Sequence, residues 1–458
     1  MIRVFNVYYP VRTLVLMGGE LLIITASFLL AVQIAFGEDA FLVLNYENGF
    51  YKVLGVTLLA LLCLYYFDLY DPQRLRSYGE TYFRLLVTLA ALSFLLAGFG
   101  YFFPEFMLGN GVFLMGLTIL TVSLFGWRAT YSWLMRQPFL RENVFVLGSG
   151  PRAQKIVDAL RDRLDLGMDV VRWEDGNGNG SPSRDSMAGV LKTIRHKGGV
   201  DRVIVSLHDR RGTLPVRELL DVRLNDVKVE DAADLLERIN GKIEIDDLHP
   251  SWLIFSEGFR LNSGFLFTRR VVSVLVSFAL LLVVLPLLPL IALVIRLSSP
   301  GPILYRQKRV GRNGQVFTCF KFRTMRADAE ADTGPTWASD QDPRITIFGR
   351  FLRATRLDEL PQLWNVFKGD MGFVGPRPER PEFVEWLSRE IPYYNLRHLV
   401  RPGITGWAQI NYPYGASMEE AKEKLKYDLY YIKNISLTFD LYIMFQTVKI
   451  VTIGRGAK

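Results

Sequence analysis

Cysteine and histidine are scarce in this sequence. Among its 458 residues there are two cysteines, Cys63 and Cys319, and four histidines. Cys63 lies inside an apolar run, Cys319 lies in a distant segment, and the histidines show no spacing typical of metal ligands. We therefore expect neither a disulfide scaffold nor a Cys/His zinc site.

Negative charge is also in deficit. The chain has 54 Lys and Arg residues against 46 Asp and Glu residues, which gives a net charge of +8. The basic residues flank the apolar runs and crowd the C-terminal third. This placement favours a membrane surface and phosphate-bearing substrates as partners, and we expect no nucleic-acid partner.

Long apolar runs, in contrast, are frequent, and half of the residues are hydrophobic. The first run is about long enough to span a bilayer, although Glu20 interrupts it. It lacks the small-residue cleavage site of a signal peptide and further runs follow, so we expect a retained helix. Residues 1–140 are thus predicted to form a bundle of four transmembrane helices, at 14–36, 51–67, 82–103 and 112–127.

The charges between these runs predict their orientation, because Lys and Arg in short loops stay in the cytoplasm. Basic residues precede the first run, separate the second from the third, and follow the fourth. We therefore place the N-terminus and everything after the fourth helix in the cytoplasm. The basic residues concerned are Arg3, Arg12, Arg74, Arg76, Arg128, Arg136 and Arg141.

Residues 141–262 have the composition of a soluble α/β domain. A strand-like run at 143–147 is followed by Gly148-Ser149-Gly150-Pro151-Arg152-Ala153, which matches the G-x-G-x-x-A turn of a Rossmann unit. Glu174 or Asp175 is the candidate acid for a ribose. The segment is short for a complete dinucleotide fold and has no catalytic constellation, so a Rossmann-like structural or regulatory domain is favoured over an oxidoreductase. The further predicted strands are 169–174, 200–207 and 228–229.

A fifth uncharged run, 271–295, is long enough to cross a membrane, but two features favour a re-entrant hairpin. Basic residues lie at both of its ends, so the positive-inside rule places both ends in the cytoplasm. Pro286 and Pro289 break its middle. The alternative is a fifth full span, which would put the acidic pair described next outside the cell.

Residues 349–378 contain two adjacent carboxylates, Asp358 and Glu359, amid several arginines. The apolar positions that follow have the spacing of one helix face, and Pro361 is tolerated only in a first turn, so the acids are expected at a helix N-terminus. An ionised Asp among phosphate-neutralising arginines is suited to nucleophilic attack on phosphorus, and Glu359 to holding Mg²⁺ or assisting a second step. The plainer interpretation is an N-cap Asp with a first-turn Glu paired to nearby arginines.

Several basic residues around this pair are candidate ligands for phosphate. Residues 315–322 alternate as a short strand does, which predicts that Lys321 and Arg323 share a polar face. Arg377 lies in Gly375-Pro376-Arg377-Pro378, and Arg401 is followed by Pro402 and Gly403; such stiff loops present a guanidinium group. Such loops are equally compatible with ordinary turns. Residues 437–453 are predicted to form an interfacial helix, with a buried core helix as the alternative.

Three segments resemble the bacterial monotopic phosphoglycosyl transferases, also called polyprenyl-phosphate sugar transferases. They read SSPGPILYRQKRVGRNGQVFTCFKFRTM, DPRITIFGRFLRATRLDELPQLWNVFKGDMGFVGPRP and RPGITGWAQINYPYG. The four predicted spans and the Rossmann-like domain resemble the long form of the family. The N-terminal FNVYYPVRTLVLMGGE looks like the branch linked to exosortase-associated exopolysaccharide systems.

The resemblance implies a two-step phosphosugar transfer by a mainly α catalytic domain, 263–458. Asp358 is expected to attack the β-phosphate of a UDP-sugar and expel UMP, and undecaprenyl phosphate then takes the phosphosugar. The resemblance also implies that Asp358 and Glu359 bind Mg²⁺. The family's membrane helix breaks at a Ser-Pro pair, which corresponds here to Leu285-Pro286, so the proline is kept and the serine is absent. The residues expected to bind substrate are Lys321, Arg323, Arg353, Arg377, Pro378 and Arg401.

The setting implied is the bacterial inner membrane, with the catalytic domain on the cytoplasmic face and a homodimer through the middle domain. The pathway would be exopolysaccharide biosynthesis, and no motif identifies the sugar. Two other functions remain open: a membrane-anchored nucleotide sensor or scaffold, and a glycosyltransferase that releases UDP. The sequence has no convincing D-x-D motif to support the latter.

Overall fold

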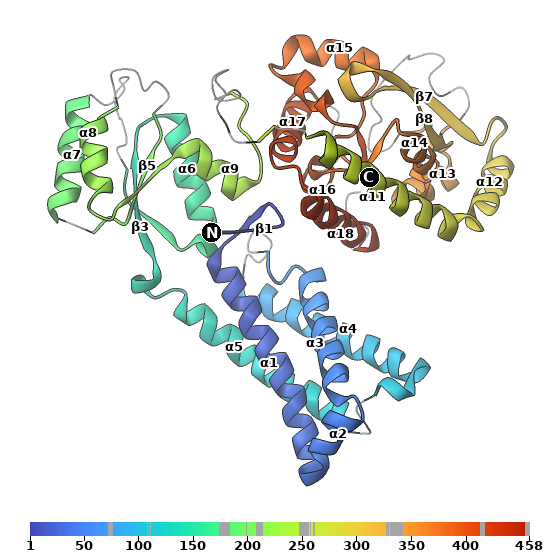
Figure 1. Ribbon diagram of the computed structural model, residues 1–458, viewed down its shortest axis with the longest axis horizontal. Coiled ribbons are helices and arrows are strands. Elements are labelled where there is room, and N and C mark those ends of the chain that lie inside the picture. The colour runs from blue at the N-terminus through green and yellow to red at the C-terminus, as the bar shows by residue number, and fades with distance from the viewer. Residues whose placement is uncertain are drawn as a thin grey trace. The chain divides into compact units, whose positions relative to one another are not determined.

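A computed structural model of the chain shows two compact units (Figure 1). The first comprises residues 1–3 and 8–235, and the second comprises residues 4–7 and 236–458. The structure describes residues 1–71, 77–107, 109, 111–173, 184–197, 199–207, 214–246, 256, 258–259, 262–326, 329, 342–412 and 417–453.

The first unit contains four long apolar helices, as the hydrophobic runs predict. Each is long and apolar enough to cross a membrane. They are α1 (Val11–Phe36), α3 (Gly49–Tyr66), α4 (Tyr78–Phe102) and α5 (Val112–Leu134). A hairpin of β1 (Ile2–Val4) and β2 (Val7–Tyr9) precedes them, and η1 (Gly37–Asp39), α2 (Ala40–Tyr46), η2 (Pro104–Phe106) and η3 (Pro138–Leu140) connect or follow them.

Helices α1 and α5 pack along each other (Figure 1), and two glycines make this approach possible. A Cβ atom on Gly19 would lie 2.1 Å from the Trp127 ring, and one on Gly116 would lie 2.6 Å from Phe28. Glu20, the acid that interrupts the first apolar run, is fully buried in this contact. It accepts a 2.6 Å hydrogen bond from Arg128 Nε, so the interruption is one half of a buried ion pair.

The α/β part of the first unit is a four-stranded parallel sheet, as the sequence predicts. Its order is β4-β3-β5-β6, with strands β3 (Glu142–Leu147), β4 (Met168–Trp173), β5 (Arg202–Val205) and β6 (Lys228–Asp231). Strand β3 is buried from Val144 to Leu147, which explains its continuous apolar run. The connecting helices are α6 (Pro151–Asp162), η4 (Leu164–Leu166), α7 (Arg184–Lys197), α8 (Val216–Arg223) and α9 (Ala232–Asn240).

The glycine turn predicted between the first strand and helix is present. Gly148 has φ of 135°, and a Cβ atom there would lie 2.9 Å from the Ser206 carbonyl oxygen, so the position requires glycine. The turn leads directly into α6. The two candidate ribose acids, Glu174 and Asp175, lie outside the described residues.

The second unit carries the remaining elements. Its helices are α11 (Ser263–Val284), α12 (Leu287–Ser298), α13 (Ile347–Ala354), α14 (Gln362–Lys368), α15 (Pro381–Glu390), α16 (Trp407–Asn411), α17 (Met418–Lys433) and α18 (Leu437–Ile453). The short turns are η5 (Arg312–Gly314), η6 (Leu357–Glu359) and η7 (Tyr394–Leu399). β7 (Leu304–Val310) pairs antiparallel with β8 (Val316–Phe322), and β9 (Gly372–Val374) pairs parallel with β10 (Gly403–Thr405).

The core of the second unit forms around α17 and α18. Phe439 and Ile443 of α18 are fully buried there, whereas Leu441 and Val448 on its other side are exposed. The helix therefore packs into the core along one face and leaves an apolar face uncovered. Ile243 and Ile245, which follow α9, are also buried in this core.

The fifth apolar run is not one continuous helix. Helix α11 ends at Val284, Pro286 caps α12, and the chain changes direction between them (Figure 1). Pro286 therefore marks the helix break that the sequence predicts. Helix α11 by itself is long and apolar enough to cross a membrane.

Candidate active site

The acidic pair lies in a tight turn rather than in the first turn of a helix. Asp358 and Glu359 belong to the 3₁₀ turn η6, and α14 begins only at Gln362, with Pro361 at its N-cap. Arg356 enters the turn in a left-handed conformation, with φ of 58°. The expected helix start is thus displaced by one turn, and neighbouring side chains, more than the seven-residue α14, set the charge around the pair.

Glu359 is clamped by two cations. Its Oε1 accepts hydrogen bonds from Lys321 Nζ at 2.9 Å and from Arg377 at 2.6 Å, and only 7% of the residue is exposed. Burial alone would raise the pKa of Glu359, but the charges of Arg377 and Lys321 outweigh burial and hold this pKa well below its usual range. Glu359 is therefore fixed in position as a carboxylate.

The carboxylate of Asp358, unlike that of Glu359, is not held by a cation. It is as buried as Glu359, yet within the described part of the chain no group forms a hydrogen bond with its carboxylate. Burial and the adjacent charge of Glu359 raise the pKa of Asp358, and Lys321, Arg353 and Arg377 oppose this rise. The two neighbouring acids thus have different properties, since one is tethered and strongly acidic whereas the other is untethered and more basic.

The strand that carries Lys321 is fixed to the helix that follows the acids. Asn365 of α14 is fully buried; its Nδ2 donates to the Thr318 carbonyl at 2.7 Å and its Oδ1 accepts from the Phe320 N–H at 3.0 Å. Sequence reasoning missed this residue. Sequence periodicity could not have found it, because Asn365 lies outside the predicted apolar face of Leu360, Leu363, Trp364 and Phe367.

The two predicted proline and glycine loops meet through backbone hydrogen bonds. The Gly375 N–H donates to Thr405 at 2.8 Å, and the Gly403 N–H donates to Pro376 at 3.0 Å. A Cβ atom on Gly375 would lie 2.4 Å from the Arg401 carbonyl oxygen, so this approach requires glycine. The contact brings Arg377 to Gln409, whose Oε1 accepts a 3.1 Å hydrogen bond from it.

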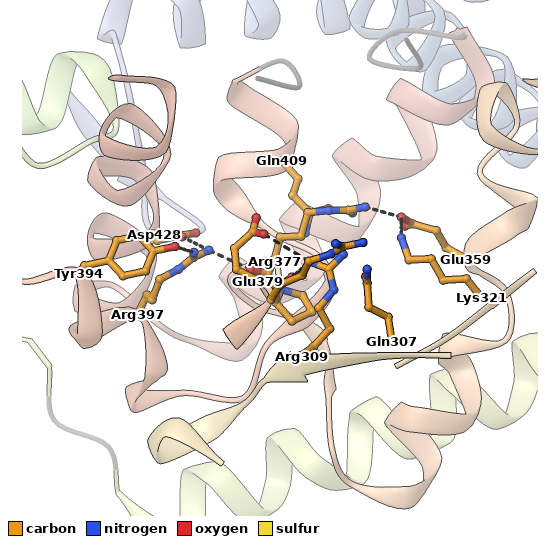
Figure 2. A network of polar contacts seen from close by, with 12 residues as sticks. Gln307, Arg309, Lys321, Glu359, Arg377, Glu379, Tyr394, Arg397, Gln409 and Asp428 are labelled. Atoms are coloured by element: carbon orange, nitrogen blue, oxygen red, sulfur yellow. Dashed lines mark hydrogen bonds and ion pairs between the residues drawn. The ribbon is translucent and has the colours of Figure 1, made fainter. Parts of the chain in front are cut away.

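A second layer of polar residues supports Arg377 from behind (Figure 2). Arg397 donates to the Arg377 carbonyl at 2.9 Å and to the Tyr394 hydroxyl at 2.6 Å. It also forms a buried ion pair with Asp428 at 2.9 Å. These contacts, which sequence reasoning did not find, restrict the backbone of the residue that clamps Glu359.

The remaining candidate residues form hydrogen bonds with partners other than the two acids. Arg353 donates to Thr324 Oγ1 at 2.9 Å and contributes to the charge around Asp358. Arg323 does not share Lys321's partner: it is buried and donates to the Ser299 carbonyl and hydroxyl at 2.7 and 2.9 Å. Within the described residues its Nε and one terminal nitrogen have no hydrogen-bond partner.

Arg401 and Pro378 contact other parts of the protein. Arg401 Nε donates to the Gly369 carbonyl at 3.0 Å, at the end of α14 opposite the acids. The Pro378 carbonyl accepts a 2.9 Å hydrogen bond from Arg309. The structure therefore gathers Lys321, Arg353 and Arg377 around the acidic pair and gives Arg323, Arg401 and Pro378 separate contacts.

Comparison with known proteins identifies the family. A profile described as bacterial sugar transferase matches residues 265–454, which include the acidic pair and its three cations. A UDP-glucose:undecaprenyl-phosphate glucose-1-phosphate transferase of Escherichia coli is 34% identical over 329 residues, which are 69% of each chain. The chain belongs to the bacterial sugar transferase family. Family membership and the long apolar helices together show a membrane-bound protein.

Two further relatives of the family differ in how much of the chain they share. A UDP-N-acetylgalactosamine-undecaprenyl-phosphate N-acetylgalactosaminephosphotransferase of Aeromonas hydrophila is 40% identical over 243 residues, which are 53% of this chain and 56% of that protein. An exopolysaccharide production protein of Rhizobium leguminosarum bv. phaseoli is 41% identical over 194 residues, which are 41% of this chain and 97% of that protein. This chain therefore spans little more than half of the Aeromonas protein and nearly all of the Rhizobium protein.

Proposed function

We propose that this protein transfers a sugar 1-phosphate from a UDP-sugar to undecaprenyl phosphate and releases UMP, as the initiating step of exopolysaccharide synthesis. The observation that carries the proposal is the division of labour in the acidic pair: Glu359 is tethered by Lys321 and Arg377, whereas Asp358 is untethered. The names of the relatives supply the substrate classes.

The first step uses Asp358 as the nucleophile. A carboxylate oxygen of Asp358 forms a bond to the β-phosphorus of the UDP-sugar, and the bond from that phosphorus to the oxygen shared with the α-phosphate breaks. The electron pair leaves with UMP. Arg353, Arg377 and Lys321 are placed to neutralise the negative charge that phosphoryl transfer spreads over the phosphate oxygens.

The second step returns the enzyme to its starting state. A phosphate oxygen of undecaprenyl phosphate attacks the phosphorus of the aspartyl phosphosugar, and the bond to Asp358 breaks. The carboxylate is regenerated and the product is a polyprenyl diphosphate sugar. Because Glu359 is held by two cations, it does not compete with Asp358 for the phosphorus.

The residues present also fit Mg²⁺. Among the described residues there is no cluster of three or more His, Cys, Asp or Glu side chains, which excludes an all-protein cage there. Mg²⁺ commonly uses one or two carboxylates and completes its shell with substrate phosphates and waters. Asp358 and Glu359 provide such a pair, and Mg²⁺ bound there would neutralise diphosphate charge.

We further propose that α11 and α12 form a re-entrant hairpin on the cytoplasmic face of the bacterial inner membrane. Both ends of the hairpin attach to the catalytic unit. At the α11 end, Arg270 donates to the carbonyls of Val366 and Phe367; at the α12 end, Ile295 packs against Phe322 and Leu352. A half-inserted hairpin would hold the active site at headgroup depth, where a lipid phosphate and a cytosolic UDP-sugar both reach it.

The test is to incubate the purified full-length protein in nanodiscs with a panel of UDP-sugars, Mg²⁺ and undecaprenyl phosphate, and to follow UMP. The expected result is UMP release with one or a few donors, together with a phosphosugar adduct on Asp358 when the lipid acceptor is omitted. Asp358→Asn should abolish both signals, whereas Glu385→Gln, a matched change at an exposed acid paired with Arg389, should retain them. Release of UDP would contradict the proposal, as would unchanged turnover of Asp358→Asn.

A further inference from the structure

A cavity of about 540 Å³ lies in the first unit, and the acidic pair belongs to the second. It is found where α1 and α4 begin and α5 ends, next to the loop before β4. Its volume is in the range of sites for small molecules. Four arginines and several tyrosines line it, among them Arg12, Arg128, Arg136, Arg141, Tyr82 and Tyr131.

Arg128 is the residue that points to a ligand. It is only 6% exposed; its Nε donates to Glu20 at 2.6 Å and one terminal nitrogen donates to the Leu69 carbonyl at 2.9 Å. The other terminal nitrogen, Nη2, is buried and has no hydrogen-bond partner among the described residues. A buried charged N–H group without a partner is costly, so an acceptor is expected in the cavity that Arg128 lines.

The charge of the cavity wall favours an anion. Four arginines line it and only two acids do, Asp165 and Asp169. Both acids are already paired: Asp165 with Arg163 at 2.9 Å and Asp169 with Arg141 at 2.7 Å. A water molecule would satisfy one N–H group but would leave the excess positive charge uncompensated. A phosphate group offers several charged oxygens to a planar guanidinium group.

The depth of the cavity matches a lipid headgroup. Arg128 lies six residues before the end of α5 at Leu134, or about 9 Å along the helix axis. Tyrosines at such helix ends are typical of the membrane interface. Basic residues are common at cytoplasmic helix ends, where they are normally exposed to water. That preference does not explain Arg128, because Arg128 is buried.

We propose that this cavity binds the phosphate group of an anionic lipid, as a site separate from the catalytic one. Free phosphate is the soluble source of the same chemistry. Arg128 Nη2 would donate a hydrogen bond to a phosphate oxygen. Arg136, which is exposed just after α5, would contribute positive charge at the edge of the cavity. Its guanidinium carbon lies 4.7 Å from the centre of the Tyr78 ring. The proposal does not depend on sugar transfer.

The test measures lipid binding to the full-length protein after delipidation. Phosphatidylglycerol is titrated into nanodiscs of phosphatidylcholine, inorganic phosphate is titrated in a parallel arm, and native mass spectrometry reports bound lipid. Arg128→Lys keeps a cation for Glu20 but removes the spare N–H, so phosphatidylglycerol should bind at least about tenfold more weakly, the equivalent of one charge-assisted hydrogen bond. Arg136→Gln, at an exposed position, should weaken binding several-fold without a risk to folding.

Arg84→Lys is the matched control, because Arg84 pairs with Glu80 at 2.6 Å on α4 and does not line the cavity. It should bind phosphatidylglycerol as the parent does. Tight binding of inorganic phosphate that is lost in Arg128→Lys would support the same site with a soluble ligand. Binding that neither Arg128→Lys nor Arg136→Gln weakens would overturn the proposal, as would a lack of binding in both arms.

Discussion

Arg397 donates a 2.9 Å hydrogen bond to the carbonyl oxygen of Arg377, the residue whose guanidinium group clamps Glu359. The position of the catalytic clamp therefore depends on a residue that does not contact the acids. Arg397 is itself held by the Tyr394 hydroxyl and by Asp428, so a buried second layer supports the active site (Figure 2).

Replacement of Arg397 is the first prediction. Arg397→Met leaves the charge of Asp428 buried without its partner, and removal of one partner of a buried pair costs about 3–5 kcal/mol of unfolding free energy. Arg397→Lys keeps the charge but cannot serve all three acceptors, so stability should fall less than activity. Thermal unfolding and UMP release measure the two effects.

The control for Arg397 is Arg389→Met. Arg389 pairs with Glu385 on the exposed side of α15, where both side chains are about 70% exposed. Such surface pairs contribute less than about 1 kcal/mol. If Arg397→Met proved as harmless as this control, the second layer would have no structural role.

The second prediction concerns Arg377 itself. Arg377→Lys replaces a planar fork, which reaches both Glu359 and Gln409, with a single ammonium group. The loss of one charge-assisted hydrogen bond is worth about 1.5–3 kcal/mol, so we expect kcat/KM for UMP release to fall roughly ten- to a hundredfold. Arg350→Lys, an exposed position on α13, should change the rate less than twofold. If Arg377→Lys and Arg350→Lys lowered kcat/KM equally, Arg377 would have no special role in holding Glu359.

The third prediction follows from the raised pKa of Asp358, whose causes are burial and the charge of Glu359. Between the unfolded and folded pKa values the folded state binds more protons, so stability falls as the pH rises through this interval. The loss of unfolding free energy reaches its full size above the pKa of Asp358 in the folded state. It vanishes below the pKa of aspartate in the unfolded state, about 3.9. Asp358→Asn should therefore be inactive but more stable at neutral pH.

The measurement is the melting temperature of wild type and Asp358→Asn over a series of pH values. The gain of the variant should shrink on acidification and disappear near the unfolded pKa of aspartate. A gain that grew in acid would show that the folded pKa is lowered. In the wild type, the acid limb of kcat/KM should lie above the ordinary range of an aspartate pKa, since the ionised carboxylate is the nucleophile.

Much of this architecture could be predicted from the sequence because its signals are local. The apolar helices and the parallel strands follow from runs of residues that are contiguous in the chain. The acidic pair, Arg353 and Arg377 all lie in one 30-residue segment, 349–378, and Lys321 lies in the short strand predicted at 315–322. The helix break at Pro286 was predicted for the same reason, because proline acts on its own backbone.

The contacts that were missed join distant positions. Glu20 was recognised only as an interruption, because its partner Arg128 lies 108 residues further along the chain. Asn365 forms its hydrogen bonds with Phe320 and Thr318, which lie 45 and 47 residues before it in the chain. Periodicity and composition contain no information about which distant groups meet, so the second layer around Arg377 was not foreseen.

The last prediction tests the hairpin of α11 and α12 by its topology. In a background with Cys63→Ala and Cys319→Ala, single cysteines are introduced by Ser263→Cys at the first residue of α11 and by Pro300→Cys after α12. Both positions are exposed and flank the helix pair. A membrane-impermeant maleimide should label both from the same face of sealed inverted vesicles, because a hairpin returns to the face that it entered.

Glu47→Cys, between α2 and α3, should be labelled only from the opposite face if α1 spans the membrane. A full span would separate the labels at 263 and 300, and it would place the acidic pair across the bilayer from cytosolic UDP-sugars.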